Sequence, residues 1–279
     1  MDGILIISFG TSYKKNREKT INVLVDTFRE TFPEIPVYLA FKSRMILKKI
    51  YEEEKISIDT VEEALKRMIL EGITRVFIQT TNIFYEIEED KENNIIINKY
   101  KNLFSGGIYI GRPLLKDEID YKKIFSILFK KFFAIGNNSD DSKNVSRETF
   151  SEITVRNTAV VLIVHGRKES RECPLDYQII KKMGYKNIFV GAVEGYPNAG
   201  FVLKEIQSLK EIEYIVLVPF FFFAGKHSIR DIAGDEKSSW KNVFHLAGYH
   251  VKYVLKGLGE YSEIRRCYIE HLQEMISAN

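Results

Sequence analysis

Short apolar runs and longer amphipathic stretches alternate along the chain. The run Ile4–Phe9 predicts a buried strand, and the stretch Asn16–Phe32 predicts a helix because its apolar residues recur every three or four positions. The same pattern predicts strands at Val37–Phe41, Val76–Gln79 and Gly107–Ile110, and helices at Ser43–Glu53, Val61–Glu71 and Tyr121–Phe133. Alternating strands and helices are typical of a parallel sheet covered by helices.

Residues 136–156 interrupt this alternation with a polar, turn-rich segment, which we interpret as a linker or a long exposed loop. The pattern then resumes, with strands predicted at Ala159–Val164, Asn187–Ala192, Tyr214–Val218 and His250–Val254 and helices near 174–184, 198–210, 236–246 and 261–276. The run 4–11 is similar to the run 160–167, which indicates a weak internal duplication. We therefore predict an α/β fold with two similar doubly wound, Rossmann-like lobes, 1–135 and 157–279, whose parallel sheets face a central cleft.

The composition is that of an ordinary globular protein, with 45% hydrophobic and 28% charged residues among 279. A net charge of +3 is too small to indicate a nucleic-acid partner, and no apolar run approaches the roughly 20 residues that span a bilayer. Two cysteines without CxxC spacing fit a reducing compartment and exclude a thiolate zinc site. The first predicted strand follows the start methionine directly, so we expect no signal peptide and a cytoplasmic location. The oligomeric state stays open, and a homo-oligomer is one of the alternatives.

Two histidines and a glutamate follow buried strands of the second lobe. His165 and Glu194 each end an apolar run, and His227 comes after a third run and the aromatic segment Phe220–Phe223. Because ligands of open α/β sheets bind at the carboxyl ends of the strands, we expect these three side chains to converge. Two imidazoles and a carboxylate can hold a divalent metal ion and leave coordination positions open. A lone histidine after a strand is more often structural than a ligand, and spacing alone leaves the pair His165 and His227 open between the two roles. We interpret the remaining histidines, His245, His250 and His271, as structural.

Six segments, spread in order along nearly the whole chain, resemble one known family. They are Ser8-Phe9-Gly10-Thr11-Ser12-Tyr13, His165-Gly166, Gly191-Ala192-Val193-Glu194-Gly195-Tyr196-Pro197, Ala224-Gly225-Lys226-His227-Ser228-Ile229-Arg230-Asp231, Ser238-Ser239-Trp240 and Gly257-Leu258-Gly259-Glu260. Together they resemble the anaerobic sirohydrochlorin cobaltochelatases, which are class II tetrapyrrole chelatases. The chain departs from that pattern at Thr80-Thr81-Asn82, where the family usually has a histidine, in the charged residues after His165, and in the insertion at 136–155.

The resemblance implies a class II chelatase fold. It also implies the insertion of Co(II) into sirohydrochlorin or a related tetrapyrrole in cobalamin biosynthesis, without ATP and with no cofactor beyond the substrate metal. It assigns metal binding to His165, Glu194 and His227, and it adds an acidic position, Glu88, which without the resemblance belongs to a solvated acidic helix start.

The expected substrate is acidic, because sirohydrochlorin-type tetrapyrroles carry several carboxylates. The loop that opens the first helix, Ser8, Phe9, Gly10, Thr11 and Ser12, is predicted to bind the substrate because helix N-termini favour anions. Glu88 is added to the predicted substrate-binding residues on the resemblance alone. Basic candidates for the same task, all equally compatible with a solvated surface, are Lys14, Lys15, Arg17, Arg44 and Arg230. The segment Phe220–Phe223 is suited to line the pocket of a flat ring, although burial in the sheet core explains it more simply.

Metal insertion requires delivery of the ion and removal of two pyrrole protons. Neutral imidazole serves both needs, since it binds borderline metals and its pKa lies near 6.5. We predict as catalytic residues His165 and His227, which bind the ion while one of them accepts a ring proton, and Glu194, which is the third ligand or a proton acceptor.

Two alternatives stay open at this point. A chelatase for Fe(II) or Ni(II) would use the same residues, because ligand chemistry does not select among these metals. A non-catalytic tetrapyrrole or metal carrier would use the same fold without a proton acceptor. A nucleotide-binding enzyme is disfavoured, because no GxGxxG follows the first strand and no Walker lysine occurs.

Overall fold

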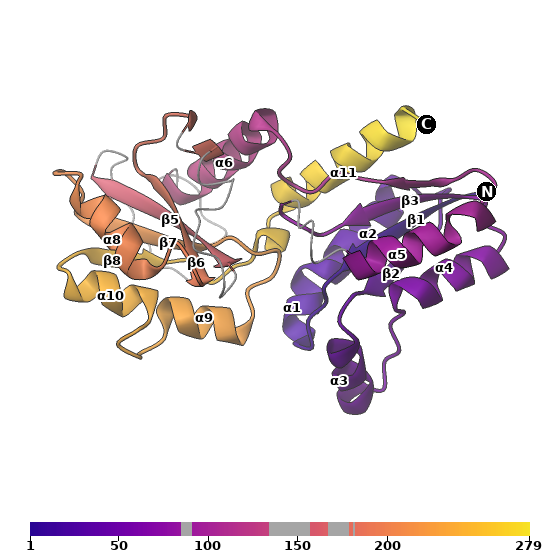
Figure 1. Cartoon of the computed structure of the whole chain (residues 1–279), viewed down its shortest axis with the longest axis horizontal. Coiled ribbons are helices and arrows are strands. Elements are labelled where there is room, and N and C mark those ends of the chain that lie inside the picture. Colours follow the sequence, from indigo (N-terminus) through magenta and orange to yellow (C-terminus); the bar gives the residue numbers. More distant parts are fainter. Residues whose placement is uncertain (85–90, 134–156, 167–178, 181) are drawn as a thin grey trace. The chain divides into compact units, whose positions relative to one another are not determined.

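The computed structural model describes residues 1–84, 91–133, 157–166, 179–180 and 182–279, without the side chains of 129, 131–133 and 226–228. Two compact units make up the chain (Figure 1). Unit 1 comprises Met1–Asp117 together with Gly259–Asn279, and unit 2 comprises Glu118–Leu258. Within the described part, no helix is both long and apolar enough to cross a membrane.

Unit 1 is a four-stranded parallel sheet with helices on both faces. Its elements are β1 (Asp2–Ser8), α1 (Lys14–Lys19), α2 (Ile21–Thr31), β2 (Val37–Phe41), α3 (Arg44–Glu54), α4 (Val61–Leu70), β3 (Arg75–Thr80), α5 (Lys91–Tyr100), the 3-10 helix η1 (Lys101–Leu103), β4 (Ile108–Ile110) and α11 (Ser262–Ser277). The strand order is β2-β1-β3-β4, and every pairing is parallel. Alternate residues of β1, Leu5 and Ile7, pack against α4 and α5, while α2 and α11 cover the opposite face.

Unit 2 repeats this architecture. Its elements are α6 (Glu118–Phe133), β5 (Thr158–Gly166), β6 (Ile188–Glu194), α8 (Ala199–Gln207), β7 (Tyr214–Pro219), α9 (Lys226–Ala233), α10 (Trp240–Leu246) and β8 (His250–Tyr253), followed by the 3-10 helix η4 (Leu258–Glu260) at the unit boundary. The strand order is β6-β5-β7-β8, again all parallel. Helices α8, α9 and α10 bury an apolar cluster against one face of this sheet.

The two sheets agree position by position, which confirms the predicted duplication. Ile4 pairs with Val37 on one side and Phe77 on the other, and its counterpart Val160 pairs with Ile188 and Val216. The same offset holds at the strand ends, where Ser8 pairs with Phe41 and Val164 with Ala192. The residues at the carboxyl ends therefore also have counterparts: Phe9 corresponds to His165, and Gly10 to Gly166.

The boundaries suggested by the sequence, 1–135 and 157–279, differ from those of the compact units. The last helix of each predicted lobe, α6 or α11, belongs to the other unit. Helix α6 belongs to unit 2, where the Phe125 ring meets Tyr185 edge to face at 5.5 Å. Helix α11 belongs to unit 1, because the Tyr268 hydroxyl donates to the Thr81 carbonyl at 3.1 Å and Glu274 accepts from Arg112 at 3.0 Å. An amphipathic pattern indicates that a helix covers a sheet but does not say which sheet.

Most predicted elements are present with ends shifted by one to three residues, and the differences have local causes. The predicted helix Asn16–Phe32 is two helices, because the backbone of Thr20 leaves the helical conformation between α1 and α2. Helices α5 and α9 were not predicted from the sequence. Helix α4 begins at Thr60 with a capping box, in which Thr60 and Glu63 satisfy each other's backbone N–H groups. The predicted linker 136–156 lies outside the described residues, as does most of the helix near 174–184.

Candidate active site

His165 stands at the carboxyl end of β5, an interior strand of the second sheet. Burial decreases along this strand, so that Val160–Ile163 are buried and the His165 side chain is exposed. Its ring rests on the ring of Phe221, with centroids 5.1 Å apart and planes tilted by 57°. The aromatic contact supports one side of the imidazole and leaves the ring accessible at the edge of the sheet.

Glu194 ends the neighbouring strand β6 and lies beside the His165 turn. Gly166 is its Cα partner across the ladder, with a φ of +74°. A Cβ atom on Gly166 would lie only 2.0 Å from the Glu194 carbonyl oxygen, so a glycine is required for the two strand ends to approach. This close approach places the backbones of His165 and Glu194 next to each other at the carboxyl edge.

The turn after Glu194 is fixed by two local contacts. The Ala192 N–H donates to the Pro197 carbonyl at 2.7 Å, which closes the turn on β6. Asn198 then caps α8, because its side chain accepts from the Phe201 N–H at 3.0 Å. The exposed Glu194 carboxylate therefore leaves the strand end at a backbone position that the surrounding structure defines.

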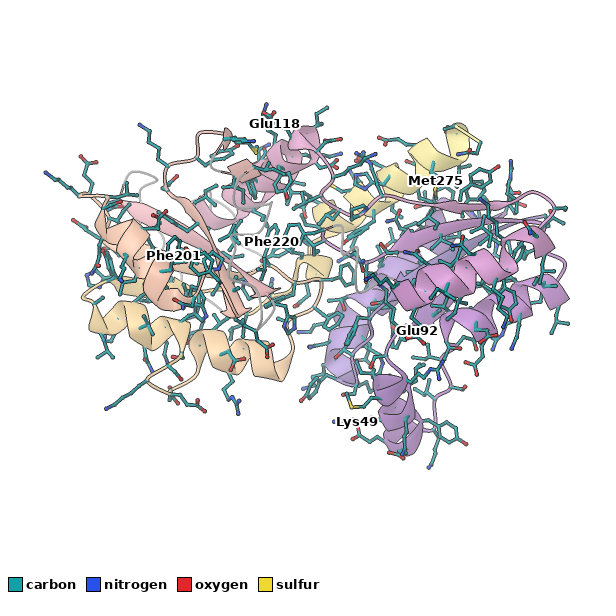
Figure 2. All side chains as sticks on the ribbon, viewed as in Figure 1. Lys49, Glu92, Glu118, Phe201, Phe220 and Met275 are labelled. Atoms are coloured by element: carbon teal, nitrogen blue, oxygen red, sulfur yellow. The ribbon has the colours of Figure 1, made fainter. Side chains whose placement is uncertain are left out.

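The connection from β7 to α9 brings His227 to the same edge. The segment Phe220–Phe222 is buried in unit 2 (Figure 2). The Phe220 N–H donates to the Ile163 carbonyl at 2.7 Å. A Cβ atom on Gly257 would lie 2.5 Å from the Phe223 Cα, so the segment 220–224 is also confined from the other side. Helix α9 starts at Lys226 and packs on β6 and β7, which places the backbone of His227 in its first turn.

The backbone thus brings three of the predicted positions to one sheet edge. Among the side chains that the structure describes, no three His, Cys, Asp or Glu residues form a group able to hold a metal ion. The His227 side chain is outside that description, so the three-ligand site stays a prediction. Glu88, in the connection between β3 and α5, also lies outside the described residues.

The loop Ser8–Ser12 occupies the corresponding edge of the first sheet. The buried Ser8 hydroxyl accepts from the Thr81 hydroxyl at 3.0 Å and from the Gly10 N–H at 3.4 Å. Gly10 has a φ of +90°, and a Cβ atom there would lie 2.5 Å from the Phe41 ring. Ser8, Gly10 and the buried Thr11 therefore shape the loop, whereas Phe9 is 56% exposed and the partly exposed Ser12 also reaches solvent.

Comparison with known protein families identifies the family of this chain. The model described as "Cobalt chelatase (CbiK)" matches residues 2–277. The chain belongs to the CbiK cobalt chelatase family. This membership confirms the resemblance found in the sequence motifs.

Two relatives agree with this assignment, and one solved structure has a similar fold. The chain is 29% identical to sirohydrochlorin cobaltochelatase of Salmonella typhimurium, over 98% of this chain and 96% of the relative. It is 25% identical to sirohydrochlorin cobaltochelatase CbiKC of Nitratidesulfovibrio vulgaris, over 99% and 91%. SirB from Bacillus subtilis, solved with Fe3+, has a TM-score of 0.65 at 16% identity, covering 98% of this chain and 95% of SirB. The structural match confirms the predicted fold.

The basic residues that were candidates for binding the acidic substrate of this CbiK-family protein differ in burial and in ion pairing. Arg17 is buried in an ion pair with Glu54, so it is unavailable to a substrate carboxylate. The other four, Lys14, Lys15, Arg44 and Arg230, are exposed. Lys14 lies 4.0 Å from Glu18, and Arg44 lies 3.5 Å from Glu92. Arg230 lies 3.9 Å from both Asp231 and Glu236.

Lys42 is a basic residue at the edge of the first sheet that the sequence did not single out. The backbone N–H of Lys42 donates to the Ser8 carbonyl at 2.9 Å, and its side-chain ammonium donates to Asn82 Oδ1 at 3.3 Å. The signal was available, because Lys42 directly follows β2 and so reaches the carboxyl edge of the sheet.

Proposed function

We propose that this protein inserts Co(II) into sirohydrochlorin or a closely related tetrapyrrole, without ATP and with no cofactor beyond the substrate metal. The observation that carries the proposal is the edge of the second sheet, where His165 and Glu194 end paired strands and α9 begins with His227 in its first turn. Membership of the CbiK family over residues 2–277, and the names of the two relatives, support this substrate and this metal.

The reaction exchanges two protons for one metal ion. The two pyrrole N–H bonds break, four ring nitrogens bind the ion, and two protons leave, so the ring gains a divalent metal without any redox change. The protein must hold the ion without enclosing it and must accept protons near it. Exposed imidazole and carboxylate groups at one sheet edge are suited to both tasks.

Each residue has a defined part in this scheme. His165, supported on one side by Phe221, presents an exposed imidazole that binds the ion or accepts a ring proton. Glu194 supplies a carboxylate that offsets the ion's charge and acts as a ligand or proton acceptor. His227 completes the set from α9. We assign tetrapyrrole binding to the loop Ser8–Ser12, where Phe9 offers an exposed apolar ring for a flat substrate.

An anaerobic absorbance assay with sirohydrochlorin and Co(II) tests the proposal. Wild-type protein freed of metal by a chelator should accelerate the spectral change to the metallated ring when Co(II) alone is added, with no ATP. His165→Ala, His227→Ala and Glu194→Gln should each lower kcat by about 100-fold or more while tetrapyrrole binding is largely kept. His245→Ala is the matched control, because His245 is exposed on α10 and should leave the rate unchanged.

The outcomes separate the alternatives. A faster rate with Fe(II) or Ni(II) than with Co(II) would change the metal and leave the reaction class in place. Metallation no faster than the protein-free control with every metal, despite tetrapyrrole binding, would overturn the enzyme and favour a carrier. We also infer a cytoplasmic location, because the sparse cysteines fit a reducing compartment.

A further inference from the structure

Arg17 of helix α1 is buried although it carries a full charge. Its side chain is 5% exposed, and that of its partner Glu54 is 17% exposed. A guanidinium removed from water is tolerated only where its N–H groups have acceptors, because an unpaired buried charge is strongly unfavourable. The contacts of Arg17 therefore show what the fold uses this residue for.

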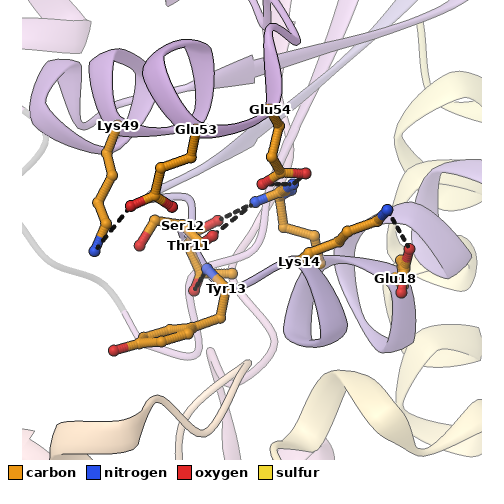
Figure 3. A network of polar contacts seen from close by, with 9 residues as sticks. Thr11, Ser12, Tyr13, Lys14, Glu18, Lys49, Glu53 and Glu54 are labelled. Atoms are coloured by element: carbon orange, nitrogen blue, oxygen red, sulfur yellow. Dashed lines mark hydrogen bonds and ion pairs between the residues drawn. The ribbon is translucent and has the colours of Figure 1, made fainter.

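Those contacts join a loop to a helix. Arg17 Nη1 donates to the carbonyl oxygens of Thr11 and Ser12 at 3.2 Å and 3.1 Å, and Nη2 donates to both carboxylate oxygens of Glu54 at 2.6 Å (Figure 3). The planar fork of arginine can serve both partners at once, which a lysine ammonium cannot reproduce. Two consecutive peptide groups of the loop Ser8–Ser12 are thus fixed in orientation, since each peptide is planar.

Helix α3 forms the other side of this clamp. At its start, the Ser43 N–H donates to the Phe9 carbonyl at 3.3 Å, and at its end Glu54 holds Arg17. Ile50 is the only residue of α3 with a buried side chain, so apolar packing alone holds this helix weakly. The loop carbonyls of Phe9, Thr11 and Ser12 are therefore all held through α3 or Arg17, and the exposed Phe9 ring projects from a fixed backbone.

We propose that Arg17 and Glu54 are positioning residues, which hold the loop Ser8–Ser12 in the conformation that receives the tetrapyrrole. This inference rests on the proposed function, because it assumes that the loop binds the substrate. It predicts a split between the two substrates: the KM for the tetrapyrrole depends on the clamp, whereas the KM for Co(II), whose predicted ligands lie in unit 2, does not.

The test compares variants in the anaerobic metallation assay, after circular dichroism and urea unfolding have established that each is folded. Arg17→Gln should raise the tetrapyrrole KM by about tenfold or more with the Co(II) KM unchanged, and Arg17→Lys should give an intermediate value. Glu54→Gln should have a smaller effect, since the carbonyl contacts of Arg17 remain. Arg29→Gln, which breaks an exposed ion pair with Asp26 on α2, is the matched control and should change neither KM.

A charge exchange separates positioning from simple stabilisation. Arg17→Glu combined with Glu54→Arg keeps opposite charges at the two positions but removes the donor that holds the Thr11 and Ser12 carbonyls from α1. The tetrapyrrole KM should stay raised in this double variant, and its return to the wild-type value would overturn the inference. If Arg17→Gln does not fold, the comparison of Arg17→Lys with wild type decides in the same way.

The two proposals fail differently. An inactive wild-type protein would overturn the proposed function itself. An active wild type, together with folded Arg17 variants whose tetrapyrrole KM is unchanged or whose two KM values rise equally, would overturn the positioning role alone.

Discussion

Replacing Gly166 by alanine tests the site geometry, because this residue sets the distance between the ends of β5 and β6. The added Cβ atom would meet the Glu194 carbonyl oxygen at 2.0 Å and the Ala192 Cβ at 2.5 Å. Contacts under 3.0 Å are essentially unknown for Cβ atoms, so the strand ends must separate by about 1 Å. Both neighbours are main-chain or Cβ atoms, which cannot rotate away as a long side chain can.

Two costs add in the Gly166→Ala variant. An alanine at a φ of +74° is disfavoured by about 1–2 kcal/mol, and overpacking between the strands costs about 1–3 kcal/mol more. The displacement also moves Glu194 relative to His165. A shift of about 1 Å in a catalytic arrangement can lower the rate by about 100-fold, which is the loss of kcat that we expect.

Gly248→Ala is the matched control, because Gly248 has a φ of +94° but no atom within 4 Å of the added Cβ. The Gly248→Ala variant therefore has the free-energy cost of alanine at a positive φ, without any displacement of neighbouring strands. Urea unfolding would measure stability, and the anaerobic absorbance assay would measure kcat. Equal kcat values for Gly166→Ala and Gly248→Ala would refute the argument that the close approach of the strands positions the site.

Three further predictions concern stability and are checked by urea unfolding. Glu62 accepts hydrogen bonds from two lysines and a tyrosine, which lower its pKa from 4.5 to about 2; Glu62→Gln should therefore be destabilising above pH 4.5, with the difference disappearing as the pH falls to about 2. A Cβ atom on Gly191 would lie 2.0 Å from the Trp240 ring, so Gly191→Ala should cost about 1–3 kcal/mol, and its cost should fall when Trp240→Ala is also present. Tyr268→Phe removes the buried hydrogen bond to the Thr81 carbonyl and should cost about 1 kcal/mol; no change would show that this contact does not hold α11.

The sequence predicted the sheets well because buried parallel strands are marked by continuous apolar runs. Val160–Ile163 and Ile215–Val218 are such runs, and both are buried strands. It predicted the ends of β5 and β6 well enough to place His165 and Glu194 at one edge, since carboxyl ends coincide in any parallel sheet. Helix α9 was missed because eight residues following an aromatic run give too short a pattern for a periodicity argument.

What the sequence could not predict depends on contacts between distant segments. The burial of Arg17 was not predicted, because its partner Glu54 is 37 residues away and the charge of Arg17 suggested an exposed binding group. The assignment of α11 to unit 1 likewise depends on Tyr268 and Glu274 meeting Thr81 and Arg112, more than 150 residues earlier. These are tertiary contacts, and the local pattern of polar and apolar residues does not predict them.

The duplication places two different side chains, Phe9 and His165, at equivalent positions of the two sheets. The corresponding glycines, Gly10 and Gly166, both have positive φ values and both lie against the neighbouring strand, so the turn itself is a common structural element. The side chain just before the glycine is free to differ, and it is Phe9 in unit 1 and His165 in unit 2. An exposed apolar ring suits a flat macrocycle, and an exposed imidazole suits a metal ion. If the two substrates divide between these turns as we propose, the division requires no change in the fold, only in the residue before each glycine.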